Sequence, residues 1–150
     1  MRPLARTLVA FLLTLAFAYI LGIIVQTILN GGDIIQAIVN DTWRVLFSGG
    51  FVAIGLFLLF LLMANIAGRK RGSGSLFWIN SGALIIAIVL GTATTLAAGV
   101  MVGALSAGFA WLSTLGALLA AGELFAGGLI ALAITHFGLF RREQAPLTAP

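Results

Sequence analysis

Glu123 is the first candidate for chemistry, because it is an acid within an otherwise apolar stretch long enough to cross a membrane. It stands in the run Gly122-Glu123-Leu124, followed by more apolar and small residues. Ionisable side chains are costly inside a bilayer and mark proton or substrate pathways by default. Three interpretations are open: a neutral carboxyl bonded to a neighbouring helix, a transport or proton-carrying group, and a charged contact to a partner subunit.

The partners of Glu123 can be predicted from the register of a helical hairpin. A turn near Ser106 places Glu123 level with residues 89–92 of the preceding segment, so Thr92 is the nearest polar side chain. Tyr19 lies at a similar depth in the first apolar segment. An ionised carboxyl would be expensive there, so we expect a neutral Glu123 that faces the bundle interior or a subunit contact and bonds Thr92 or Tyr19.

Other residue types that could do chemistry are scarce. The chain has no cysteine, one histidine (His136) and one lysine (Lys70). Nucleophilic catalysis needs an activating base, a metal site needs several ligands, and a phosphate loop needs a GxxxxGK[ST] pattern that does not occur. We therefore expect no enzyme, cofactor or metal. His136 fits a bond to a neighbour at the membrane boundary, with a ligand or proton-relay role as the alternative.

Asn65 and Asn80 lie near the same membrane boundary, one at the end of the second apolar segment and one at the start of the third. They could hydrogen-bond each other across the 68–76 loop. The favoured interpretation is a structural link between two helices, and the alternative is a polar pore mouth.

The elements that position these residues must be membrane helices. Hydrophobic residues make up 61% of the 150 residues and charged residues only 8%, too apolar for a soluble domain. The apolar runs do not alternate with polar residues, which excludes barrel strands. We expect one all-α integral membrane domain over 1–150: a four-helix transmembrane bundle with a short amphipathic interfacial helix in its first external loop. The spans are predicted at 8–29, 51–67, 77–103 and 109–138.

Three details of this topology have alternatives. Ala16-Phe17-Ala18 could pass as a signal cleavage site, but the apolar run continues beyond it, so we expect an uncleaved first helix. The stretch 76–140 could hold three short spans, which would make five in all. Residues 143–150 are predicted to be a disordered tail.

Cations predict the orientation in the cytoplasmic (inner) membrane. With four spans, seven of the eight arginine and lysine residues fall on one side of the membrane. The positive-inside rule makes that side cytoplasmic, and both termini lie on it. The net charge of +4 is thereby explained without nucleic acid. The basic cluster Arg69-Lys70-Arg71 in the second loop could also attract anionic lipid headgroups. The seven residues are Arg2, Arg6, Arg69, Lys70, Arg71, Arg141 and Arg142.

The first external loop has a helical pattern over residues 34–46. Its apolar residues fall on one face and its polar residues on the other with a 3.6-residue period, and Asp33 is a plausible N-cap. We expect a helix lying flat on the outer membrane surface. Two further interpretations are that the segment extends the second span, and that it docks an external partner.

Small residues predict the packing of the last two spans. Gly99 and Gly103 form a GxxxG match, and Gly127 with Ala131 forms a small-xxx-small pair. We expect these two spans to form a tight hairpin, with the bulkier first two facing lipid or a large partner.

Two functions remain. The favoured one is a non-catalytic accessory, structural or assembly subunit of a larger membrane complex, with lipids and other membrane subunits as partners. The alternative is a small oligomeric transporter or channel, proton-coupled through Glu123.

Overall fold

The computed structural model describes residues 3–47, 50–68, 71–101 and 107–139, which are helical apart from short turns. Its helices are α1 (Pro3–Leu29), α2 (Ile34–Phe47), α3 (Gly50–Ala67), α4 (Ser73–Met101) and α5 (Ala107–Ala133). α5 continues directly into the π-helix η1 (Ile134–Leu139). The prediction of an all-helical chain is confirmed for the described residues.

Three of these segments are long and apolar enough to cross a membrane. They are α1 over its whole length, Ser73–Ala97 of α4, and Leu115–Leu139 of α5 and η1. The apolar part of α3, Phe51–Ala67, is shorter. The described chain therefore holds three membrane-compatible helices and one shorter apolar helix. The predicted tail and the 102–106 connection lie outside the described residues.

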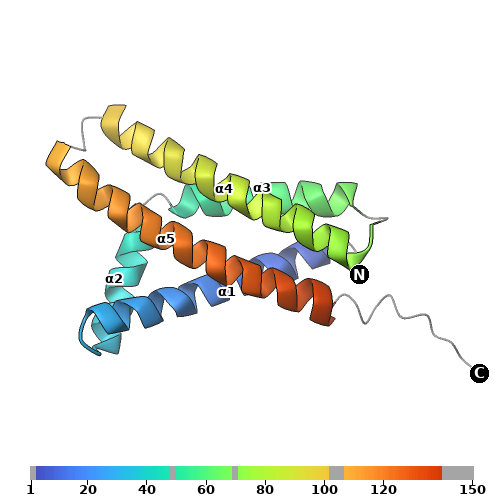
Figure 1. Ribbon diagram of the computed structural model, residues 1–150, viewed down its shortest axis with the longest axis horizontal. Coiled ribbons are helices and arrows are strands. Elements are labelled where there is room, and N and C mark those ends of the chain that lie inside the picture. The colour runs from blue at the N-terminus through green and yellow to red at the C-terminus, as the bar shows by residue number, and fades with distance from the viewer. Residues whose placement is uncertain (1–2, 48–49, 69–70, 102–106, 140–150) are drawn as a thin grey trace, which may run out of the picture.

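The long helices pair differently from the prediction. Among the described residues, α3 packs along α4 and α1 packs along α5 more extensively than α4 packs against α5 (Figure 1). α3 buries Phe57 and Leu61, whereas Phe51, Leu59 and Met63 of the same helix are exposed. The last two long helices pack against each other as expected, but each packs more extensively along one of the bulky helices, which still turn large side chains outward.

Small residues of α4 and α5 explain this pairing. A Cβ added to Gly91 of α4 would lie 2.5 Å from Cα of Ala53 in α3, and one added to Gly127 of α5 would lie 2.5 Å from the Ala18 nitrogen in α1. Small residues let backbones approach closely, and here each meets a helix rich in large side chains. Ala131, one turn after Gly127, is fully buried. Gly99 lies in α4, but its contacts are outside the description, and Gly103 lies outside the described residues.

The predicted helix in the first loop is present as α2. Asp33 caps it, because the Gln36 backbone nitrogen donates to Asp33 Oδ1 at 3.0 Å. Gly31 and Gly32 precede it with φ of 67° and 98°, a conformation that favours glycine. α2 runs across the bundle instead of extending α3 in line (Figure 1), so the interpretation that it only lengthens the second span is not supported.

Candidate functional site

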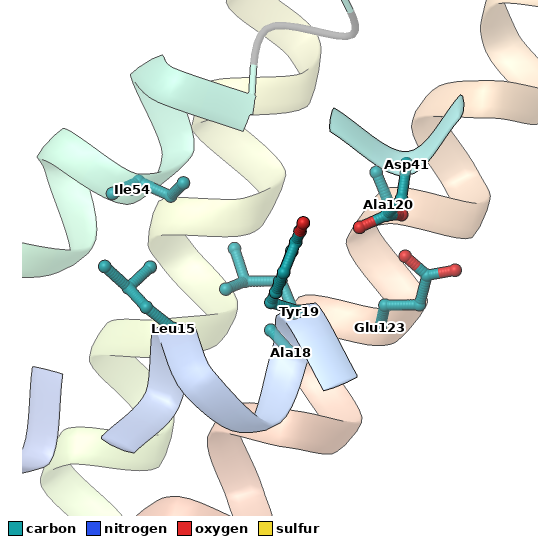
Figure 2. Close-up of a pocket in the computed structure, with 8 residues that line it drawn as sticks. Leu15, Ala18, Tyr19, Asp41, Ile54, Ala120 and Glu123 are labelled. Atoms are coloured by element: carbon teal, nitrogen blue, oxygen red, sulfur yellow. The ribbon is translucent and has the colours of Figure 1, made fainter. Parts of the chain in front are cut away.

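A cavity of about 260 Å³ lies where α2 crosses the bundle, and it holds two acids (Figure 2). It is called the carboxyl pocket below. Its lining comes from four helices, α1, α2, α3 and α5. The lining residues are Leu15, Ala18, Tyr19, Asp41, Ile54, Ala120, Glu123 and Leu124.

Glu123 reaches the carboxyl pocket from α5. It lies on the face of α5 that also buries Leu124, Gly127 and Ala131, at spacings of one helical turn. Its side chain is 9% exposed. The prediction that Glu123 faces the bundle interior is therefore confirmed.

Asp41 reaches the same pocket from α2 and is 1% exposed. It can approach α1 because residue 22 is glycine: a Cβ there would lie 2.5 Å from Asp41 Oδ1. The carboxyl groups of Asp41 and Glu123 point toward one another (Figure 2). Residues 82 positions apart in the sequence are thus brought together by the crossing of α2 over α1 and α5.

Of the two partners predicted for Glu123, one lines the carboxyl pocket and the other does not. Tyr19 lines the carboxyl pocket and is 41% exposed, so its ring is partly at the outer surface of the bundle. Thr92 of α4 is half-buried and is not among the lining residues. Register along the hairpin suggested Thr92, but α5 turns this face toward α1 and α2 instead of α4.

The burial of Asp41 was not predicted, because the helical pattern places it on the polar face of α2, which was expected to face water. One sequence signal sets it apart from the other polar residues there. Ala37 precedes it by one turn, so a small residue and an acid share a narrow stripe. Ala37 is fully buried with Asp41, while Ile34 and Ile35 of the same helix are exposed. The polar side of α2 at this stripe faces protein and the apolar side faces outward.

The described residues that line the carboxyl pocket are acidic in their charge composition. Its eight lining residues include two carboxyls and one phenol, and none is basic. Carboxyl and phenol oxygens can exchange protons or coordinate a cation, and carboxylates facing one another repel when both are ionised. This arrangement can hold positive charge, as a proton or a cation, between Asp41 and Glu123.

A second buried polar group lies at the end of the bundle where the chain begins. It is called the asparagine–histidine cluster and consists of Thr7 (α1), Asn65 (α3), Asn80 (α4) and His136 (η1). Each is at most 3% exposed. Asn65 Nδ2 donates to Thr7 Oγ1 at 3.1 Å, Asn80 Nδ2 donates to Asn65 Oδ1 at 3.4 Å, and Asn80 Nδ2 lies 2.8 Å from His136 Nε2.

The cluster confirms the predicted bond between Asn65 and Asn80. It also shows His136 bonding a neighbour, as the simpler interpretation of that residue expected. The contacts of His136 and Thr7 with the asparagines were not predicted from the sequence. Their shared position near the same end of four apolar segments was the available signal.

Most of the basic residues that predict the membrane orientation lie outside the residues that the structure describes. Arg71 is exposed, as a residue that contacts headgroups must be. Positions 69, 70, 141 and 142 fall outside the described residues.

Within the part of the chain that the structure describes, no group of three or more His, Cys, Asp or Glu side chains gathers in a way that could hold a metal ion. Comparison of the chain with protein-family models, curated proteins and solved structures finds no match.

Proposed function

We propose that this chain is a small integral membrane protein that carries protons or monovalent cations at the Asp41–Glu123 pair, as a transporter or channel without enzymatic activity. The observation that carries the proposal is the burial of two mutually facing carboxyls in one cavity. A single acid in a span can be structural. A second one, supplied by a different helix, adds a cost that a purely structural contact would avoid.

The proposed membrane arrangement has four spans, in which α3 crosses the membrane in addition to the three longer helices. The 18 residues of α3 extend about 27 Å at 1.5 Å per residue, close to the ~30 Å hydrocarbon core. α3 also packs along α4, which is long enough to span. Both termini are then cytoplasmic and α2 lies at the outer side of the inner membrane, in agreement with the positions of the cations.

Charge explains why the pair suits cation movement. An ionised carboxyl in hydrocarbon costs several kcal/mol, and a second one facing it adds repulsion. A proton or a monovalent cation between Asp41 and Glu123 reduces both costs.

The test is proton flux in vesicles that contain the purified protein and an internal pH dye. The wild type should dissipate an imposed pH gradient, and Glu123→Gln and Asp41→Asn should each remove most of that flux while the protein still assembles. Asp33→Asn is the matched control, because it removes an exposed acid and asparagine caps a helix as well as aspartate. Wild-type vesicles that leak no faster than empty ones, for protons, Na⁺ and K⁺ alike, would refute the proposal.

A second candidate is the non-catalytic accessory subunit of a larger membrane complex. The observation favouring it is the outward side of α2, where large apolar residues are 40–78% exposed: Ile34, Ile35, Ile38 and Val39. Such a surface suits lipid or the helix of a partner protein. Gentle solubilisation followed by mass measurement separates the candidates. A defined larger partner favours the subunit, and a homo-oligomer that conducts alone favours the transporter.

A further inference from the structure

The asparagine–histidine cluster has hydrogen bonds with a fixed direction. Asn80 Nδ2 carries two hydrogens, one directed to Asn65 Oδ1 and one to His136 Nε2. His136 Nε2 must therefore accept, which makes the ring neutral and places its proton on Nδ1. Further along, Asn65 Nδ2 donates to Thr7 Oγ1, and that hydroxyl donates to the Pro3 carbonyl oxygen at 2.9 Å.

Asn80 Oδ1 is an atom of this cluster that lies outside the chain of bonds. It is buried and accepts no hydrogen bond from the described residues. A buried acceptor without a donor costs about 1–3 kcal/mol, so such atoms are rare and need a reason. In the Asn80 carboxamide, Nδ2 donates hydrogen bonds while Oδ1 accepts none within the described part of the chain. A rotation of 180° about the Cβ–Cγ bond exchanges the positions of Nδ2 and Oδ1.

We propose that His136 and Asn80 form a second proton-binding site, in which protonation of His136 turns the Asn80 carboxamide over. A proton from the solvent at the chain-terminal side binds Nε2, and the ring becomes an imidazolium with both nitrogens as donors. Nε2–H then donates to Asn80 Oδ1. Asn80 Nδ2 swings away, and the bond to Asn65 Oδ1 is lost. Protonation thereby releases α3 from α4 and η1 at this end of the bundle.

The charged groups that face His136 are counted over the described residues. α3 and α4 carry no charged residue, and Arg6 is the charged residue of α1. Arg6 lies close enough to act on the imidazole electrostatically, and Arg71 is exposed. On its own helix, the nearest charged residue among those described is Glu123, 13 positions away. Among the described residues, a protonated His136 therefore meets the cation Arg6 and the amide of Asn80.

The backbone at His136 supports a switching role. η1 begins two residues before it, and π-helical turns inside α-helices are frequent at functional sites. The proposal uses none of the residues of the carboxyl pocket, so it can hold or fail independently of the proposed function.

The first experiment is nitrogen NMR of protein labelled with ¹⁵N-histidine in lipid bilayers. His136 is the single histidine, so one ring is observed. We expect a neutral ring protonated on Nδ1 at high pH, and one transition to the imidazolium on acidification. In Asn80→Leu the neutral ring should lose this tautomer preference, whereas Asn65→Leu should keep it. A neutral ring protonated on Nε2, or no titration over the range where the protein stays folded, would overturn the proposal.

The second experiment measures the release of α3 directly. The chain has no cysteine, so Ile66→Cys and Gly138→Cys place two spin labels uniquely, and both positions are exposed. The distance between labels should lengthen or broaden over the pH range of the His136 transition, and the change should vanish in Asn80→Leu. An unchanged distance in the protein that retains Asn80 would overturn the proposed release of α3.

Discussion

The carboxyl pocket and the asparagine–histidine cluster are both buried and polar, yet they differ in how their polar groups are satisfied. The cluster joins neutral amides, a hydroxyl and an imidazole in a directed chain that touches four helical elements. The pocket brings two acids together beside open space. The first arrangement links helices through hydrogen bonds, whereas the second places two carboxyls next to a cavity. The contrast suggests where structure and where ion chemistry reside in this bundle.

The largest expected effect comes from closing the approach of Asp41 to α1. Gly22→Val would place side-chain carbons where the Asp41 carboxyl lies, so α2 must move and Asp41 must leave the carboxyl pocket. We expect a destabilisation of about 1–3 kcal/mol, as for overpacking, together with loss of ion flux. Gly55→Val in α3 is the control, because open space surrounds that glycine. Thermal unfolding in detergent that shows equal effects at both glycines would contradict the pocket geometry.

A smaller effect on stability should separate the two regions. Asn80→Leu removes the central donor of the cluster and strands the acceptors on Asn65 and His136, so we expect a loss of about 1–2 kcal/mol. Asp41→Asn keeps the size of the side chain and removes one of two facing carboxyls, so we expect it to destabilise the protein less than Asn80→Leu. Unfolding midpoints in detergent measure both. The reverse order would mean that the pocket, not the cluster, holds the helices together.

The smallest effect should distinguish the two hydroxyl residues predicted to bond Glu123. Tyr19→Phe removes the phenol from the carboxyl pocket and should lower ion flux by a few-fold, with folding unaffected because the ring remains. Thr92→Val lies away from the pocket lining and should leave flux at the wild-type level. Flux is measured in vesicles. If Thr92→Val lowers flux more than Tyr19→Phe does, Thr92 is the partner of Glu123, as the hairpin register predicted.

Local features of the fold could be predicted from the sequence. The helix predicted over 34–46 is α2 at Ile34–Phe47, and the predicted cap at Asp33 is present. The bond between Asn65 and Asn80 was predictable because a short loop joins the helices that carry them. The inward direction of Glu123 was predictable because exposure of a carboxyl to lipid is costly.

The sequence by itself determined that this chain forms apolar helices, roughly where they lie, and that Glu123 avoids lipid, because these follow from hydrogen bonding and transfer energies along one segment. Only the tertiary structure decided that α1 pairs with α5 and α3 with α4, and that Asp41 meets Glu123. Those contacts depend on which glycine of one helix faces which backbone of another. Many helix pairs in an apolar sequence offer similar small residues, so local pattern alone does not select among them.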